Sequence, residues 1–384
     1  MSRDQDLYLS EEPLWAEFRA SWKAARPPRI VLHGGYGKGN LGDDSILEVI
    51  LARIRREWPD AAVTVICHGP AWVRATHGVE AHFFATPGAW RAIARADLYI
   101  IGGGGIMNRI NSYSGFRRLR LLDPKGKYQF LAAILAKACG ACVSFYCVST
   151  TSVPDPLAGW LAGIAINRAD WVTVRGPLSV RVLRSLGVRR LLPITPDPAH
   201  GIIAVGPERA REILAAEGVD LSRPLVALNF RYVAEPDIDN VATVAEVARL
   251  TDRLVADYNA AVLFVPFSRH PRSVAENDIH FSAAVQARLG GRSGLTVLSR
   301  PYSPAEIKGI LSLASVCIME RHHAVLLAAT AGAPVVGVIY DAKVEQYMDR
   351  AGLPARIPLR EFRAERALQA IAALVPALRP ADRL

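Results

Sequence analysis

Four titratable residues stand together at residues 320–323, where Glu, Arg, His and His separate two apolar runs. Residues 315–319 are typical of a strand and residues 324–331 of a helix, so the four lie on a strand-to-helix turn. Cations at the N-terminal end of a helix oppose the helix dipole unless an anion joins them. Arg321 offers a planar fork for a carboxylate or phosphate, and His323 can move a proton near neutral pH. The turn therefore predicts an anion-binding site with acid–base capacity.

A further cation follows a strand in the same half of the chain. Residues 223–231 are typical of a buried strand, and Arg231 stands just past its end. In sheets of this kind ligands bind beyond the carboxyl ends of the strands, so we expect Arg231 to face the ligand rather than the core. Arg269 and His270 hold the corresponding place after the next strand, where a solvated loop is the favoured interpretation.

Residues 34–45 form a glycine-rich loop between the first strand and a helix. Its glycines let the backbone approach a ligand closely, and Asn40 or Asp43 can cap the helix, whose N-terminal amides favour anions or sugar hydroxyls. No acidic residue ends the second strand, which excludes the dinucleotide fingerprint, and Lys38 precedes neither Ser nor Thr, which excludes a Walker loop. A tight turn with a helix cap is the structural alternative.

A second loop, at residues 102–105, ends the third strand in four consecutive glycines. A packed core does not require such a run. Close approach of a ligand, or of the opposite domain, is the reason we expect for it.

Short apolar runs alternate with amphipathic segments along the whole chain. Strands are predicted at residues 29–34, 62–69, 96–105, 141–148, 170–176 and 190–195, then at 223–231, 260–267, 294–299, 315–319 and 334–341. Helices are predicted at residues 43–58, 127–138, 157–167, 177–186, 241–258, 274–289, 304–314 and 324–331, with flanking helices before residue 28 and at 365–374. This alternation indicates parallel sheets with helices on both faces.

A stretch rich in Pro and Gly at residues 193–206 divides the pattern into two similar halves. The sequence therefore predicts an α/β protein with two Rossmann-like domains, residues 1–200 and 201–384, whose parallel sheets face a central cleft.

Composition limits the function classes. The 384 residues are 51% hydrophobic and 21% charged, which is a globular composition, and the formal net charge is +10. Such a charge suits an acidic substrate, an anionic membrane surface or nucleic acid, but arginine is spread along the chain, so we expect no nucleic-acid partner. No run of about 18 uncharged apolar residues and no apolar signal segment occurs, and the five cysteines argue against a secreted disulfide framework. These features predict a cytoplasmic protein.

Five motifs, taken as a set and in order, resemble the polysaccharide pyruvyl transferase family. They read GYGKGNLGDDSIL, ADLYIIGGGG, RGPLSVRVLRSLGV, TPDPAH and ERHHAVLLAATAGAPVVGVIYDAKV, within residues 29–347. The resemblance implies a two-domain enzyme of the glycosyltransferase-B (GT-B) type. Such an enzyme moves the enolpyruvyl unit of phosphoenolpyruvate onto a sugar of a glycan or lipid-linked saccharide, forms a pyruvate ketal and releases phosphate. It implies phosphoenolpyruvate as co-substrate, no cofactor and no metal.

The resemblance also implies roles for individual residues. The residues that would bind the donor are Arg231, Arg321, His323 and Lys343 in the second domain. Catalysis falls to Arg231, Arg321 and His323, with His323 as acid and Asp43 as base. Acceptor binding falls to Gly37, Asn40, Asp43, Gly103, Gly104 and Asn108 in the first domain. The chain departs from the family pattern at Glu320 and His322, which stand where a small or apolar residue and a Leu are usual.

Two alternatives remain open at this point. One is a GT-B glycosyltransferase that uses a nucleotide sugar, with Glu320 holding the ribose. The other is a non-catalytic, glycan-binding member of an exopolysaccharide assembly system. A lipid-linked acceptor would bring the basic protein to the inner face of the membrane as a peripheral protein.

Overall fold

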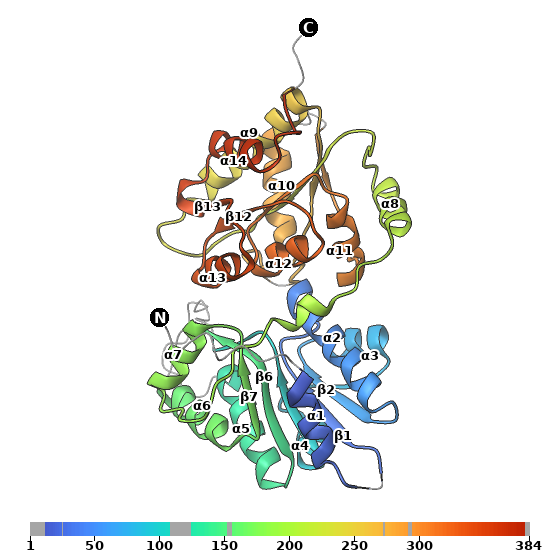
Figure 1. The fold of residues 1–384 in the computed structure, drawn as a ribbon, viewed down its shortest axis with the longest axis vertical. Helices are drawn as coiled ribbons and strands as arrows, with labels where there is room; N and C mark the ends of the chain where they lie inside the picture. The colour runs from blue at the N-terminus through green and yellow to red at the C-terminus, as the bar shows by residue number, and fades with distance from the viewer. Residues whose placement is uncertain are drawn as a thin grey trace. The chain divides into compact units, whose positions relative to one another are not determined.

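The computed structural model describes residues 12–24, 26–107, 124–151, 156–271, 273–290 and 294–380. The chain divides into two compact units, which we describe separately. The first unit comprises Met1–Lys38 and Asp43–Pro198, and the second comprises Gly39–Gly42 and Ala199–Leu384. In Figure 1 the first unit runs from blue to green, and the second, apart from Gly39–Gly42, runs from yellow-green to red.

The first unit contains a parallel sheet with the order β3-β2-β1-β4-β6-β5, and β7 also pairs with β6. Its strands are β1 Arg29–His33, β2 Ala62–Cys67, β3 Glu80–Phe83, β4 Leu98–Gly102, β5 Gly105–Met107, β6 Cys142–Thr150 and β7 Trp171–Val174. Its helices are α1 Glu12–Ser21, α2 Leu41–Glu57, α3 Pro70–His77, α4 Pro87–Ala94, α5 Pro124–Ala138, α6 Pro156–Arg168 and α7 Pro177–Ser185. The short 3-10 helix η3, Pro198–Gly201, follows.

Apolar, largely β-branched sequences place the strands of the first unit in its core. Every residue of β4, the central LYIIG run, is buried. Helix α5 contacts both α4 and α6, and all three contribute to one core cluster with the strands. The predicted flanking helix α1 inserts Trp15 and Phe18, which contact Tyr146, Trp58 and Trp171 edge-on or tilted. Aromatic packing therefore attaches α1 to the sheet.

The second unit contains a parallel sheet with the order β10-β9-β8-β11-β12-β13. Its strands are β8 Leu225–Asn229, β9 Ala261–Phe264, β10 Leu295–Val297, β11 Val316–Met319, β12 Val335–Ile339 and β13 Arg356–Pro358. Its helices are α8 Pro207–Ala216, α9 Asn240–Tyr258, α10 Asp278–Leu289, α11 Pro304–Ser312, α12 His322–Thr330, α13 Ala342–Ala351 and α14 Ala364–Leu374, with the 3-10 helix η4 at Leu359–Glu361. The two parallel sheets confirm the predicted α/β class.

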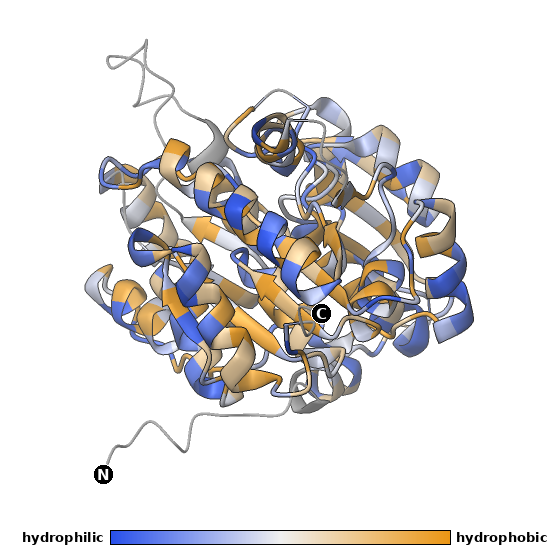
Figure 2. Ribbon diagram, turned by 90° about the horizontal axis from the view of Figure 1, so that it is seen from above, coloured by the Kyte–Doolittle hydropathy of each residue, from blue (hydrophilic) through white to orange (hydrophobic). Residues whose placement is uncertain are grey.

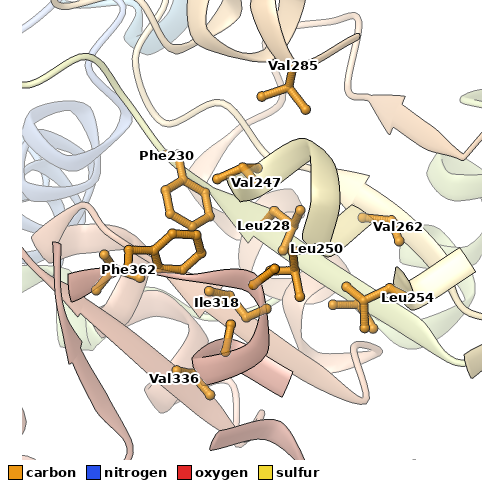
Figure 3. Packing of buried hydrophobic residues seen from close by; sticks show 14 of the residues in the cluster. Leu228, Phe230, Val247, Leu250, Leu254, Val262, Val285, Ile318, Val336 and Phe362 are labelled. Carbon is orange, nitrogen blue, oxygen red and sulfur yellow. The ribbon is translucent and has the colours of Figure 1, made fainter. Parts of the chain in front are cut away.

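Two helical layers enclose the sheet of the second unit. Helices α10 and α14 contact α9, whereas α11, α12 and α13 contact one another in sequence. Apolar residues concentrate in the strands and polar residues in the outer helical positions (Figure 2). Figure 3 shows the core beside α9, where Phe230 packs edge-on against Phe362 close to Leu228 and Ile318. Phe230 lies in this core, so the alternation of an extended chain turns its neighbours Asn229 and Arg231 the other way.

One predicted strand is wrong. Residues 190–195 form no strand, and only an isolated bridge joins Val174 to Ile194. Pro193 accepts a hydrogen bond from Val174 N–H but has no N–H of its own to extend the ladder. Among the described residues, no helix has both the length and the hydropathy of a membrane span.

Candidate functional site

Asp278 lies at the centre of a buried polar network beyond the carboxyl ends of β8 and β9. Its fully buried carboxylate accepts hydrogen bonds from the backbone N–H groups of Phe267 and Ser268, at 2.9 and 3.2 Å, and from Asn229 Nδ2 at 3.1 Å. Arg321 completes the set, with Nε 2.9 Å from both carboxylate oxygens and Nη2 2.6 Å from Oδ1. Five hydrogen-bond donors thus surround the Asp278 carboxylate.

The same network fixes the position of Arg321, one of the predicted donor-binding residues. Its backbone N–H donates to Asn229 Oδ1 at 3.1 Å, and Nη2 also approaches the Glu276 carbonyl at 3.3 Å. Asp278 occupies the edge of the guanidinium formed by Nε and Nη2. Nη1 makes no hydrogen bond to the part of the chain that the structure describes. The edge that includes Nη1 is the one that remains for an anion.

Arg231 lies close to the same turn because β8 and β11 are neighbouring parallel strands, with Met319 paired to Asn229. Arg231 Nε donates to the Tyr232 carbonyl at 3.1 Å, and its guanidinium carbon lies 5.7 Å from the Tyr340 ring centre. The Lys343 ammonium lies 5.6 Å from the same ring. Two of the predicted donor-binding cations therefore lie close to one aromatic ring.

Lys343 belongs to the first turn of α13, which Asp341 caps by accepting the Lys343 N–H at 3.0 Å. Lys343 Nζ also lies 3.1 Å from Asp341 Oδ2. Burial opposes the charge, but Tyr340 and Asp341 outweigh it and hold the pKa of Lys343 above its ordinary value. Lys343 is therefore a cation at neutral pH.

Glu320 differs from the other charged residues of the turn because it is completely buried. Its Oε2 accepts the Arg231 backbone N–H at 3.2 Å, while Oε1 has no hydrogen-bond partner among the described residues. Burial raises the pKa of Glu320 to about 8, against the opposing effect of Arg231 and Arg321. From the sequence Glu320 was placed on the turn that faces the ligand, whereas its side chain is buried in the protein.

His323 lies in the first turn of α12 and packs against the backbone of Gly42. The helix begins at His322, two residues earlier than predicted, with Arg321 as N-cap. A Cβ atom on residue 42 would lie less than 3.0 Å from three atoms of the His323 imidazole. The absence of a side chain at Gly42 thus leaves the space that the His323 ring fills.

Gly42 belongs to a four-residue segment, Gly39–Gly42, that clusters with the second unit although the surrounding sequence belongs to the first. Leu41 N–H donates to the Phe267 carbonyl at 2.8 Å, and Arg269 N–H donates to the Gly39 carbonyl at 2.8 Å. Asn40 forms an antiparallel bridge with Ser268. We call this segment the strap. Asn40, assigned from sequence to the acceptor side of the first domain, therefore pairs within the second unit.

His322 contributes to a cluster of rings beside this turn. Its ring centre lies 5.0 Å from that of His323 and 5.4 Å from that of Tyr347, and Tyr347 in turn lies 5.7 Å from His200. All three contacts are edge-on. These contacts restrict the direction of the His322 ring.

In the first unit Asp43 lies between the two glycine-rich loops. A Cβ atom on Gly104 would lie 3.1 Å from Asp43 Oδ1, and one on Gly35 would lie 3.2 Å from Oδ2. Both Asp43 and Asp44 belong to the first turn of α2, where the helix dipole stabilises negative charge. The structure thus brings Asp43 and Gly104, two predicted site residues, into one place.

Asp44 is a buried carboxyl group that the sequence analysis did not single out. Its Oδ1 accepts the Gly37 N–H at 2.8 Å. Burial raises the pKa of Asp44 to about 7, with a further contribution from the charge of Asp43, although the bond from Gly37 acts in the opposite direction. The signal in the sequence is the pair of adjacent aspartates at a helix start, where only one of the two can face solvent.

Internal packing accounts for part of the glycine runs. A Cβ atom on Gly103 would collide with Ile46, and one on Gly102 would collide with the Tyr36 hydroxyl, which donates to the Gly102 carbonyl at 2.6 Å. A Cβ atom on Gly37 would lie 2.8 Å from the Gly69 backbone. Gly102 and Gly103 are therefore required by packing inside the first unit, contrary to the expectation that a core needs no such run. Asn108, the remaining predicted acceptor residue, lies outside the described residues.

Family comparison adds to this geometry. The model of the polysaccharide pyruvyl transferase family matches residues 40–342, which is most of the chain. The chain belongs to this family. Because it belongs to this family, the protein is a transferase of polysaccharide biosynthesis. No curated protein matches it in sequence.

Solved structures similar to this pyruvyl transferase family member show its fold. UDP-GlcNAc 2-epimerase of Methanocaldococcus jannaschii has a TM-score of 0.58 at 10% identity, covering 92% of this chain and 95% of the other. MnaA of S. aureus with UDP has a TM-score of 0.58 at 12% identity, with coverages of 91% and 88%. ADP-heptose lipopolysaccharide heptosyltransferase II of E. coli has a TM-score of 0.51 at 13% identity, with coverages of 91% and 99%. These neighbours confirm the predicted GT-B-like class.

The raised pKa of Asp44 gives this pyruvyl transferase family member a measurable pH dependence of stability. Between about pH 4 and pH 7 the unfolded chain carries Asp44 ionised while the native state keeps it protonated, so the free energy of unfolding falls as the pH rises. Asp44→Asn cannot ionise and can still accept the Gly37 N–H. We therefore expect the free energy of unfolding of the variant, relative to that of the wild type, to rise by up to about 4 kcal/mol between pH 4 and pH 7.

Urea unfolding of both proteins at about pH 4, 5.5 and 7 measures this difference. A difference that does not change with pH would contradict a protonated Asp44 in the native state.

Proposed function

We propose that the protein transfers the enolpyruvyl unit of phosphoenolpyruvate onto a sugar and leaves it as a pyruvate ketal. In this reaction the C3 carbon of phosphoenolpyruvate takes a proton and C2 becomes electrophilic. One sugar hydroxyl oxygen bonds to C2, the bond from C2 to the phosphate oxygen breaks, and a second hydroxyl of the same sugar closes the ketal. The two hydroxyl protons balance the one added at C3 and the one that leaves with phosphate.

The observation that carries the proposal is the set of cationic groups in the second unit. Arg231 and Arg321 follow neighbouring strands, and Lys343 shares the Tyr340 ring with Arg231. Phosphoenolpyruvate carries a phosphate and a carboxylate, which suit arginine side chains. The N-terminal end of α12 adds backbone N–H groups that favour an anion. We assign the donor to these groups.

His323 and Asp43 are the groups that we assign to proton transfer. His323 stands at the helix end that would hold the donor, so it is the candidate acid for C3. Asp43 lies between the loops of Gly35 and Gly104, so it is the candidate base for the acceptor hydroxyl. If the acceptor is lipid-linked, the net charge of +10 favours contact with an anionic membrane surface.

The structure weakens one alternative function. A glycosyltransferase that uses a nucleotide sugar was considered because Glu320 could hold a ribose. Glu320 is fully buried, and its Oε2 accepts the Arg231 N–H instead. The non-catalytic, glycan-binding alternative predicts that a sugar binds without release of phosphate from phosphoenolpyruvate.

Acceptor-dependent phosphate release tests the proposal. Phosphoenolpyruvate is incubated with the protein and a panel of oligosaccharides and polyprenyl-linked sugars, and phosphate is measured together with the methyl signal of the ketal by NMR. We expect both products to appear with the same acceptor and in equal amounts. Release of a nucleoside diphosphate from a nucleotide sugar, without thermal stabilisation by phosphoenolpyruvate, would instead select the glycosyltransferase.

A further inference from the structure

We propose that Glu320 is a proton-coupled positioning residue that must be neutral for an anion to occupy the site of Arg231 and Arg321. This inference rests on the proposed function, because it concerns the place that we assign to the donor phosphate or carboxylate. It concerns a residue that does not itself contact the donor.

The two buried acids differ in the number of hydrogen bonds that they receive. Asp278 receives hydrogen bonds from Phe267, Ser268, Asn229 and Arg321, so its ionised form is well solvated by the protein. Glu320 receives a single bond, from the Arg231 N–H at 3.2 Å, and its Oε1 has no partner among the described residues. An ionised carboxylate without solvent and with one donor is unfavourable. The proton therefore belongs on Glu320.

The charges around Glu320 make its protonation state decisive for anion binding. Arg231 and Arg321 are cationic and Asp278 is anionic, so a neutral Glu320 leaves one net positive charge in this group. An ionised Glu320 cancels that charge. On the neighbouring strand end, Lys343 and Asp341 pair with each other beside Tyr340. Because their charges cancel, this pair does not change the net charge around Glu320.

Binding and protonation are linked as a consequence. Burial raises the pKa of Glu320 to about 8, so the residue is mostly neutral at pH 7 and mostly ionised at about pH 9. An anion placed beside Arg231 and Arg321 favours the neutral form further. At about pH 9 binding therefore takes up as much as one proton, and affinity falls by up to about tenfold for each pH unit above 8. A phosphate group has lost its second proton well below pH 9, so the ligand itself contributes little to proton uptake at that pH.

Calorimetry measures this linkage directly. Phosphoenolpyruvate and, separately, inorganic phosphate are titrated into the full-length protein at about pH 7 and pH 9, in two buffers that differ in ionisation enthalpy. We expect uptake approaching one proton at pH 9 and much less at pH 7. Glu320→Gln should bind the same ligands without proton uptake and with an affinity that does not fall between these pH values. Glu320→Met serves as a second variant without a carboxyl group.

Glu345→Gln is the matched control, because Glu345 is an exposed carboxyl group on α13 of the same unit, and it should keep the proton uptake of the wild type. Binding without proton uptake by the wild type at pH 9, or unchanged uptake by Glu320→Gln, would overturn the inference. Phosphate binding with proton uptake, but no binding of phosphoenolpyruvate, would support it while contradicting the proposed function. Binding of neither ligand would overturn both.

Discussion

Replacing Arg321 with Ala is expected to abolish measurable turnover and to destabilise the protein at the same time. The substitution removes the guanidinium edge that we assign to the donor, which should weaken phosphoenolpyruvate binding by about two to three orders of magnitude. It also leaves the fully buried Asp278 without its charged partner. Breaking one side of a buried ion pair costs about 3–5 kcal/mol of the free energy of unfolding. Denaturant unfolding and donor titration measure the two effects separately.

The double variant Arg321→Ala/Asp278→Asn separates structure from function. Asparagine can keep one oxygen toward the N–H groups of Phe267 and Ser268 while removing the unpaired charge. We expect it to recover much of the stability lost in the single variant and none of the turnover. Wild-type stability in Arg321→Ala, or turnover in the double variant, would contradict these roles.

Replacing Gly42 with Ala is expected to reduce turnover by about a hundredfold through His323. The added methyl group would overlap the imidazole, so the ring must move. A displacement of about 1 Å of a catalytic group commonly has an effect of this size. The backbone at Gly42 lies outside the left-handed region, so the effect is steric. Steady-state kinetics with phosphate release provides the measurement, and donor affinity should change far less than the turnover number.

Gly206→Ala is the control within the same unit. Gly206 is the N-cap of α8, and a Cβ atom there would meet only the Glu208 side chain at 3.4 Å. The Gly206→Ala variant should leave the turnover number unchanged. Because Gly42 acts through His323, adding Gly42→Ala to His323→Ala should cause little further loss. Independent, additive losses would refute the proposed link.

Much of the fold followed from the sequence because apolar runs and helical periodicity are local signals. The strands that precede Arg231 and Arg321 are examples, and their parallel pairing brings those cations together as expected. The strand predicted at residues 190–195 does not form, because an apolar run with a central proline resembles a strand but cannot extend a ladder. The direction in which each side chain points was harder to predict from the sequence. Glu320 and Arg321 are adjacent, yet one is buried and the other lines the site.

Contacts between distant parts of the chain were the least predictable. The packing of His323 on Gly42 joins two motifs that the sequence analysis placed in different domains, and neither motif carries a local sign of the other. The same holds for the Gly102–Gly103 pair, whose need for glycine comes from Tyr36 and Ile46. Asp278 was not singled out because it falls inside a helix predicted at residues 274–289, whereas in the structure the helix begins at Asp278 itself.

The strap has a consequence for how the chain is synthesised and divided. Because Gly39–Gly42 clusters with residues 199–384, the polypeptide passes between the two units three times. During translation the strap leaves the ribosome well before Phe267 and Ser268, its partners, so its pairing must await the rest of the first unit and the elements of the second unit up to β9. A cut after Pro198 would give two fragments. The C-terminal fragment would lack the strap, and the N-terminal fragment would carry the strap without its partners. Complementation by co-expressed halves, rather than independent folding of each, is the behaviour to expect from such a connection.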